Sequence, residues 1–490
     1  MALDTRHPLY ALAHPDWRVM RDCYAGEAKI KLEGHEYLPA TSGMQADGMA
    51  SDQPGGMAYD AYKKRAVFPD FVREGVAHML GLMHARPAKI ELPAGMEFMR
   101  YRGSSQGESL QHLLVRINEE QLITGRLGLL LDLPETPALG TPRLMISLYP
   151  AESVLNWDEN LSEEDYTVLN LAVLDESRYE RMPSLEWIWR PRFRALSLGP
   201  LESNEATGTY QQAVSLDRAL PLGGFTAPSV QGRELSKIPF EFVNSSDNLA
   251  APHRPPLLGL ARMCLTIYRG EADYRQNLFM QGQDTFVTIG APNTGEDGER
   301  VGAGAILNLP NGADAKYVGV QSQGLSEQRS ALEKDYAMSA QRAGQLATAK
   351  SKQIESGEAL QTRIASITAS IRSVAVAGAQ GLERILKTAA EWLGEDPAEV
   401  VVEPNLQFED LSFNPRDIVE LASAKAMGIP LSNKSIHESL KDRGYTRMTY
   451  EQELEEIGQE EPLAGALTTP PSGGDMLGGS ASAAGSSGAG

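Results

Sequence analysis

The chain has 490 residues but only two cysteines, Cys23 and Cys264. Two cysteines cannot build a disulfide framework or a four-cysteine metal site, so a reduced, cytoplasmic compartment fits best. No run of about 18 apolar residues occurs, and we therefore expect no membrane span. The first twenty residues lack the apolar core of a secretory signal, so none is expected.

Catalytic motifs are also missing. There is no G-x-x-x-x-G-K-[ST], no H-E-x-x-H and no G-x-S-x-G, which argues against a P-loop, a zincin site and a hydrolase elbow. Gly302-Ala303-Gly304 lacks the third glycine of a dinucleotide fingerprint and does not open a helix, so we interpret it as part of a loop. We expect a non-enzymatic chain with no catalytic residue, metal or cofactor.

Positive charge is scarce. The chain has 45 Lys and Arg against 65 Asp and Glu, a formal net charge of −20. So acidic a chain is not a nucleic-acid binder of the basic-patch kind, although it could still enclose DNA without gripping it. Its 42% hydrophobic and 22% charged residues are typical of globular proteins. Its length predicts about three domains.

In the N-terminal half, residues 40–56 are rich in Gly, Ser, Asp and Pro and predict a long surface loop. A helical pattern then runs from Met57 until Pro87 ends it. A short strand is expected at Ile90–Pro93, a helix at 110–123, and a buried strand at Leu129–Leu131. A β-rich layer follows, with strand-like runs at 143–149, 166–174, 185–198, 210–216 and 238–243.

The C-terminal half begins with a helix over 255–282. Strands are expected at 285–289, 305–309 and 315–320. Two long helices, 325–346 and 358–393, flank a break at Ala347–Gly357, and the second of them is rich in Ala, Ser and Gly. Beyond it we expect a strand at 400–408, helices at 415–427, 432–443 and 449–459, and a disordered tail at 462–490, which is passive unless it binds a partner.

Several strings, in order, resemble those of tailed-bacteriophage portal proteins (head-to-tail connectors), and more closely a portal-like family known only as phage proteins of unknown function. They begin with Asp22-Cys23-Tyr24-Ala25-Gly26 and Tyr37-Leu38-Pro39. Next come Tyr59-x-x-Tyr62-x-x-Arg65-Ala66-x-Phe68 and Ile238-Pro239-Phe240 with Asn244. The last is Ile418–Gly428, followed by a break with Ser432 and a Glu-rich helix after Thr449. The similarity covers about residues 10–460.

This resemblance implies an α+β portal fold that forms rings, usually of twelve subunits. It has an α/β wing, two stem helices flanking a small α/β clip, a long wing helix with a tunnel loop, and a helical crown. The small residues of the long helix would pack subunit against subunit. The expected bounds are wing 1–254, stem helix 255–282, clip 283–323, second stem helix 324–346, tunnel loop 347–357, long wing helix and wing strand 358–410, crown 411–461 and tail 462–490.

The implied function is that of the channel at one capsid vertex, through which double-stranded DNA is packaged and ejected. The implied partners are double-stranded DNA, the terminase large subunit, the major capsid and scaffolding proteins and the head–tail adaptor. Assembly would take place in the cytoplasm of the host bacterium and the product would lie in the virion. Lys350, Lys352 and Gln353 are the DNA-facing candidates, followed by Arg342 and Arg363, because basic side chains can reach phosphates.

The alternative for each of these side chains is that it faces solvent or a neighbouring subunit. For the whole chain, the alternatives are another phage connector or adaptor protein, in which the same helices form a different ring or tail piece, and a cytoplasmic enzyme with an unrecognised site. A channel wide enough for duplex DNA would distinguish the first alternative. A pocket with clustered ionisable groups would favour the second.

Overall fold

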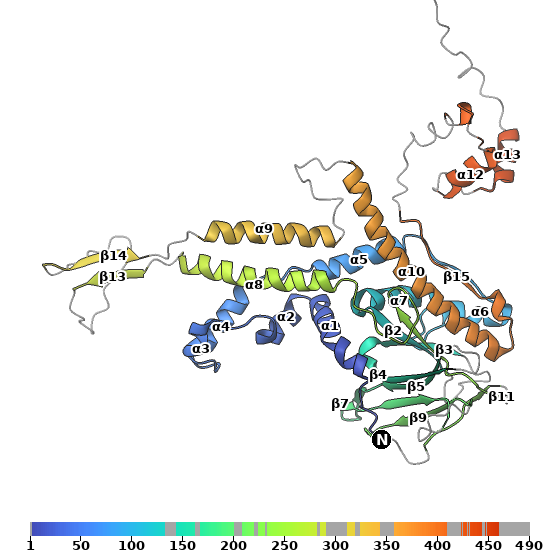
Figure 1. Ribbon diagram of the computed structural model, residues 1–490, viewed down its shortest axis with the longest axis horizontal. Coiled ribbons are helices and arrows are strands. Elements are labelled where there is room, and N and C mark those ends of the chain that lie inside the picture. Colours follow the sequence, from blue (N-terminus) through green and yellow to red (C-terminus); the bar gives the residue numbers. More distant parts are fainter. Residues whose placement is uncertain are drawn as a thin grey trace, which may run out of the picture. The chain divides into compact units, whose positions relative to one another are not determined.

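Helices and antiparallel sheets share the chain, as the expected α+β class requires (Figure 1). The chain divides into two units, Met1–Phe408 and Glu409–Gly490. The computed structural model describes residues 2–132, 144–161, 167–199, 208–219, 224–230, 233–281, 285–290, 311–318, 324–343 and 357–408 of the first unit. In the second it describes 423, 425–428, 430, 432–442, 446 and 448–459.

The first unit contains ten of the described α-helices and all of the described strands. The helices are α1 Pro8–Ala25, α2 Glu27–Glu33, α3 Ser42–Ala46, α4 Pro54–Arg65, α5 Phe71–Met83, α6 Glu97–Tyr101, α7 Leu110–Thr124, α8 Leu258–Gln281, α9 Leu325–Arg342 and α10 Gly357–Leu393. The strands are β1 Lys89–Glu91, β2 Arg126–Asp132, β3 Met145–Pro150, β4 Val154–Leu161, β5 Thr167–Asp175, β6 Arg178–Arg181, β7 Trp187–Arg190, β8 Phe193–Ser197, β9 Gln211–Ser215, β10 Ser229–Val230, β11 Arg233–Glu234, β12 Phe240–Asn244, β13 Thr285–Ile289, β14 Asp314–Val318 and β15 Val401–Glu403.

Strand β2 is the centre of a three-stranded sheet with the order β12-β2-β3. It is buried on both faces. Leu127, Leu129 and Leu131 belong to the core shared with α7 and α10, whereas Leu130 faces the core of the second sheet. A strand covered on both sides needs no polar alternation. For this reason the unbroken apolar run Leu129–Leu131 correctly predicted a buried strand.

A four-stranded antiparallel sheet, β4-β5-β8-β9, packs on the other side of the three-stranded sheet. Its core combines Trp157 of β4 with Phe240 and Phe242 of β12 and with Tyr10 and Trp17 of α1. The first helix is thereby fixed to the sheets, while its Met20 and Cys23 reach a helical core with α4, α5 and α8. Within the first unit, α1 therefore joins the sheet layer to the helical layer.

Helix α7 shows how the local sequence sets the ends of an element. The side chain of Ser109 accepts a hydrogen bond from the backbone N–H of His112 at its start. Gly125 closes it in the left-handed conformation, with φ of 76°. The predicted helix over 110–123 is confirmed, and β2 begins at the next residue.

Three predictions from the N-terminal half were wrong. The loop predicted at 40–56 contains α3 and the first turn of α4, because Pro54 is tolerated in a first helical turn. The single helix predicted between Met57 and Pro87 is two helices, since Pro69 disfavours helical backbone at the residue before it. The strand predicted over 185–198 is two strands, β7 and β8, separated by Pro191-Arg192.

The prediction that the small residues of α10 pack between subunits is wrong for those in its C-terminal part, whereas Ala369 and Ser370 are exposed. Ala375, Ala377 and Ala379 are buried inside their own chain. A Cβ at Gly378 would lie 2.4 Å from Asn118 Nδ2 of α7, and one at Gly381 would lie 2.3 Å from Val243 of β12. These small residues bring α10 close to α7 and β12, so they are not available for packing between subunits.

The second unit contains two described helices, α12 Asn433–Asp442 and α13 Tyr450–Gln459, which correspond to the predicted helices at 432–443 and 449–459. His437 of α12 lies 5.5 Å from the ring of Tyr450, between centroids, and 3.6 Å from Glu453. Leu454 and Ile457 of α13 are exposed. The predicted tail at 462–490 lies outside the described residues.

Candidate functional site

The five candidate DNA-facing residues surround the break between α9 and α10. Lys350, Lys352 and Gln353 lie outside the described residues. Arg363 belongs to α10, but only its backbone is described. Arg342, the last residue of α9, is exposed. Of the predicted set, only Arg342 therefore has a described side-chain environment.

Helix α9 runs antiparallel to α8 in Figure 1, and three contacts fix their register. The side chain of Leu332 in α9 packs against Gly270 in α8 so closely that a Cβ at this glycine would lie 3.0 Å from it. The hydroxyl of Tyr336 donates to Glu271 Oε1 at 3.1 Å, and Asn277 Nδ2 donates to Gln328 Oε1 at 3.2 Å. Burial, together with Glu271, raises the pKa of Tyr336 to about 12, so this hydroxyl keeps its proton at neutral pH.

The C-terminal end of α9 is held against α5 and α8. Ala343, directly after the helix, is fully buried, and its Cα would lie 3.5 Å from a Cβ at Gly75. An Nη1 atom of Arg342 would lie 3.4 Å from a Cβ at Gly259. The end of α9 therefore lies beside α5 at Gly75 and beside α8 at Gly259.

A groove of about 660 Å³ opens beside Arg342. It is lined by α5, α7, α8, α9 and α10 and by the chain that leads into α8. Among the described residues that line the groove, Arg342 is the only ionisable side chain, so these residues offer no acid–base pair for chemistry. Its lining residues are Met79, Leu122, Pro256, Leu257, Gly259, Leu260, Met338, Gln341, Arg342, Ser370, Ile371 and Val374.

Sheet β13–β14 occupies the connection between α8 and α9, and Figure 1 shows it beyond the ends of the two helices. Its strands pair from Thr285↔Val318 to Ile289↔Asp314. The predicted strands at 285–289 and 315–320 are confirmed within the described residues, and the one at 305–309 lies outside them. A helix, a two-stranded sheet and a returning helix thus follow one another.

A row of buried uncharged polar side chains links α5, α7 and β12, and it lies beside α10. His84 Nε2 lies 3.0 Å from Asn118 Oδ1, and Asn118 Nδ2 donates to Gln121 Oε1 at 2.8 Å. Gln121 Nε2 donates to the carbonyl of Asn244 at 2.6 Å. Burial lowers the pKa of His84, which favours the neutral ring. The row fixes the position of α10 relative to the sheet.

Two features escaped the sequence analysis. Arg126 of β2 is fully buried, and its guanidinium carbon lies 4.0 Å from the ring centroid of Trp157 and 4.2 Å from that of Phe242. No atom of this guanidinium has a hydrogen-bond partner among the described residues. An Arg directly after a helix-ending glycine gives no sequence signal for such a site.

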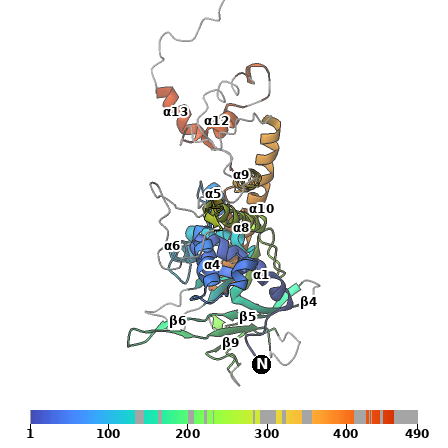
Figure 2. The same cartoon turned by 90° about the vertical axis from the view of Figure 1, so that its left-hand side faces the viewer.

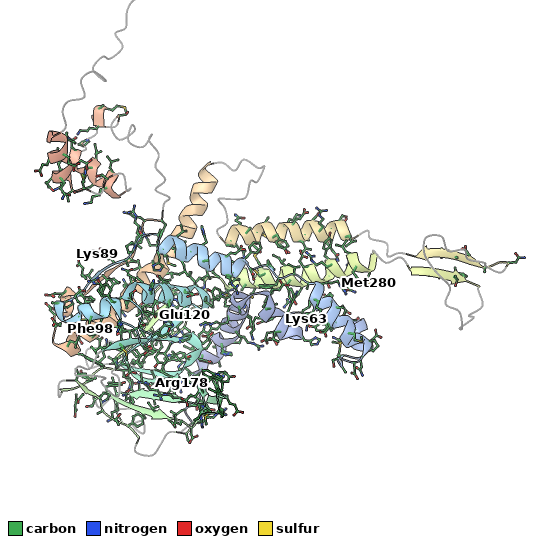
Figure 3. The ribbon with its side chains drawn as sticks, turned by 180° about the vertical axis from the view of Figure 1, so that it is seen from behind. Lys63, Lys89, Phe98, Glu120, Arg178 and Met280 are labelled. Carbon is green, nitrogen blue, oxygen red and sulfur yellow. The ribbon has the colours of Figure 1, made fainter. Side chains whose placement is uncertain are left out.

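The second missed feature is the hairpin β6–β7, residues 178–190, which we call the arm. It continues the strands β5 and β8 beyond the four-stranded sheet, through a backbone hydrogen bond from Glu176 to Arg192 of 2.8 Å. Figure 2 shows β6 projecting from the sheet, and Figure 3 labels Arg178 at its start. The cluster of three aromatic residues in a 13-residue stretch was the available signal.

Within the described part of the chain, no helix is both long and apolar enough to cross a membrane. Over the same residues, no three His, Cys, Asp or Glu side chains are grouped as a metal site would require. Cys23 and Cys264 are both buried and free, and burial raises the pKa of each thiol, which keeps them protonated.

Comparisons with known proteins match one family model and a larger set of solved structures, two of which have similar titles. A family model described as "Domain of unknown function (DUF4055)" matches residues 256–393, the stretch from the start of α8 to the end of α10. No curated protein matches the chain. Because the family model covers well under half of the chain, it assigns a family to this region only.

The two structures are titled as necks of GTA particles. One, "Neck of native GTA particle computed with C12 symmetry", is 15% identical, with 76% of this chain and 89% of that chain covered and a TM-score of 0.36. The other, "Neck of empty GTA particle computed with C6 symmetry", is 16% identical, with coverages of 79% and 91% and a TM-score of 0.34. Superpositions this loose establish neither the fold nor the role of this chain.

Proposed function

We propose that this chain is a portal-like connector subunit that forms a ring around double-stranded DNA. One observation carries the proposal: α8 and α9 form an antiparallel pair joined through the two-stranded sheet β13–β14. This is the order of stem helix, clip and stem helix that the sequence resemblance implies. The groove beside Arg342, which lacks paired ionisable groups, gives no support to an enzyme.

In this proposal the subunit keeps the bounds expected from the resemblance. The stem helices are 255–282 and 324–346, and the clip is 283–323. The tunnel loop is 347–357, followed by the long wing helix and wing strand at 358–410. The wing of 1–254 would meet the capsid, and the crown of 411–461 would face its interior.

The ring would serve as a channel for DNA during packaging and ejection, at one vertex of a virion. Its clip would bind the terminase large subunit first and the head–tail adaptor later, and assembly would involve the major capsid and scaffolding proteins. The chain itself would supply no catalysis, so the energy for packaging would come from the terminase.

Electron microscopy of the purified full-length chain tests this function. The expected result is a ring of one size, of twelve copies as the resemblance implies, with a central channel wide enough for duplex DNA. A monodisperse monomer at high concentration contradicts the proposal. A ring whose channel is too narrow for DNA supports another connector or adaptor instead.

The tunnel-loop assignment has its own prediction. Changing both Lys350 and Lys352 to Ala should reduce the nuclease-protected DNA in particles, because two phosphate contacts are lost. Ring formation should not change. The matched control is Lys434→Ala with Lys441→Ala, which removes two exposed lysines from α12. Equal DNA content in both double variants and the wild type would refute the assignment.

A further inference from the structure

The arm is an isolated two-stranded sheet with an uncovered apolar face. Tyr179 pairs with Trp189, and Arg181 pairs with Trp187. Because side chains alternate along a strand, these four lie on one face, while Arg178 lies on the other. Tyr179, Trp187 and Trp189 are 63%, 64% and 52% exposed.

An uncovered face of this kind is unfavourable for a free protein. A two-stranded hairpin is at best marginally stable in water without further packing. Among the described residues, the one ring-to-ring contact of the arm is between Tyr179 and Trp189, whose centroids lie 5.0 Å apart. Exposed aromatic clusters on a polar background are typical of protein-binding surfaces. The aromatic face therefore needs a partner.

The charge of the arm indicates which kind of partner binds it. The arm carries Arg178, Arg181 and Arg190 against Glu180 and Glu186, a net charge of +1 in a chain of −20. Arg181, on the aromatic face, has neither a hydrogen bond nor an ion pair among the described residues. The partner should present acidic groups beside an apolar contact.

The opposite end of the same sheet offers such a surface. Asp158, Glu159 and Leu161 are exposed at the end of β4, and Leu161 is 75% exposed. Neither Asp158 nor Glu159 has an ion-pair partner within 4.0 Å among the described residues. We call Asp158–Leu161 the acidic end.

The arm cannot reach the acidic end of its own chain. Leu161 pairs with Thr167 at the start of β5, whereas the arm begins after Asp175 at the end of β5. At about 3.3 Å per residue the two surfaces lie roughly 30 Å apart. Figure 2 shows β6 and the labelled end of β4 on opposite sides of the sheet. Their complementarity can be satisfied only between molecules.

We propose that the arm of one copy of this chain binds the acidic end of the next copy. The aromatic face would cover Leu161, and Arg181 would pair with Asp158 or Glu159. Two different surfaces at opposite ends of one domain make a head-to-tail contact, which closes into a ring when the rotation between copies allows it. The inference rests on the proposed ring and names a contact that helps to build it.

The area of the arm sets how much of that contact it can supply. A fully buried aromatic side chain buries about 150–250 Å². The three aromatic side chains of the arm are already about half covered, so roughly 300 Å² of their surface remains for a partner to bury. A standard interface takes about 800 Å² from each partner. The arm is thus one part of the contact between copies, and its loss should weaken association without abolishing it.

A crosslinking experiment tests the pairing directly. In the full-length double variant W189C/L161C, oxidation should produce a ladder of covalent multimers, because the two new thiols meet between copies. The native Cys23 and Cys264 are buried and give little background. The control W189C/L32C carries its second thiol on Leu32 of α2, which is 78% exposed, and should give no ladder. Equal crosslinking in the two variants overturns the inference.

Charge variants test the contact independently. The quantity to measure is the protein concentration at which half of the molecules are assembled. R181E should raise it at least about tenfold, because like charges then meet across the contact. Adding D158R should restore most of the loss. R178E changes the net charge equally on the opposite face of the arm and should have a much smaller effect.

The outcomes separate this inference from the proposed function. If the wild type forms rings, and R181E and W187S/W189S form them at the same concentration, the ring stands and the arm contact is refuted. If W187S/W189S instead loses binding to DNA while association is unchanged, the arm binds DNA and the inference again fails. A wild type that stays monomeric refutes both.

Discussion

Several residues of this chain lie in contacts so tight that a larger side chain would not fit, and Gly378 is one of them. A Cβ there would lie 2.4 Å from Asn118 Nδ2 and 2.6 Å from Gln121 Oε1. Both side chains are buried and hydrogen-bonded to each other, so they cannot move apart without losing that bond. The glycine is thus required for the polar row beside α10.

Substituting Gly378 by Ala should therefore lower the free energy of unfolding of the first unit, by about 1–3 kcal/mol as for other overpacked sites. The matched control is Gly81→Ala in α5, where nothing lies within 4 Å of the added methyl group. That change should stabilise the helix by about 0.5–1 kcal/mol. Denaturant unfolding of both variants measures the difference, and a shift of the same sign in both would contradict the packing argument.

Arg126 presents the opposite case, a buried cation with no ion pair within 4.0 Å among the described residues, on which the carboxylate of Glu159 acts only from a longer distance. Burial lowers its pKa to about 9, so it is still charged at neutral pH. Its guanidinium contacts two aromatic rings but forms no hydrogen bond among the described residues. Stacking on two rings offsets only part of the cost of removing the charge from water.

We expect Arg126→Met to raise the free energy of unfolding by about 1–3 kcal/mol, as replacement of buried charges by apolar groups often does. Arg194→Met is the control, because Arg194 is buried but paired with Glu176 at 2.7 Å and Asp132 at 2.9 Å. Its loss leaves carboxylates uncompensated and should cost about 3–5 kcal/mol. If Arg126→Met were equally destabilising in thermal unfolding, stacking would outweigh the desolvation cost.

Among the elements, α9 is attached to the first unit by few buried side chains. Over its eighteen residues only Leu332 and Ser339 are buried, whereas α7 buries nine of fifteen. Elements with little buried apolar surface open locally at low free-energy cost. We expect the amide hydrogens of α9 to exchange much faster than those of α7.

The variant Leu332→Ala should accelerate exchange in α9 further, because it removes the main apolar contact with α8. Exchange in β2 and β3 should not change, and these strands serve as the internal reference. Hydrogen-exchange mass spectrometry of the monomer or of the assembled chain gives the comparison. Slow exchange throughout α9 in the wild type would show that it is covered, for instance by a neighbouring copy.

The elements also show what the sequence could and could not predict. Regular amphipathic spacing predicted α7 because one buried face repeats with the period of a helix. The start of α4 was missed because Gly55 and Gly56 look like loop residues. They are needed there because a Cβ at Gly55 would lie 1.9 Å from the carbonyl oxygen of Met44. Such a close approach between distant residues leaves no periodic trace in the sequence.

The candidate sites differ in the same way. Spacing alone predicted a break at 347–357, between the helices that the structure describes as α9 and α10; Lys350, Lys352 and Gln353 themselves lie outside the described residues. It could not locate the arm, because the apolar run from Leu185 continues across Pro191 and hides the end of β7. Proline has no N–H to donate to the ladder, and it separates the two strands.

At the scale of the whole molecule, the net charge of −20 opposes the assembly of many copies. Repulsion between like-charged copies acts over the Debye length, about 10 Å at 0.1 M salt and 3 Å at 1 M. Attractive ion pairs between copies, such as the one proposed for Arg181, are few compared with the number of repelling charges. An anionic ring would in turn repel the phosphates of DNA, which favours sliding over tight binding.

The wild-type chain should therefore assemble at a lower concentration in 1 M NaCl than in 0.1 M, because screening weakens the long-range repulsion more than the few local attractions. The penalty of R181E should shrink over the same range, since it is purely electrostatic, whereas that of W187S/W189S should persist. Sedimentation at two salt concentrations measures all three chains. A wild type that dissociates in 1 M NaCl would show that complementary charges, rather than apolar contacts, hold the copies together.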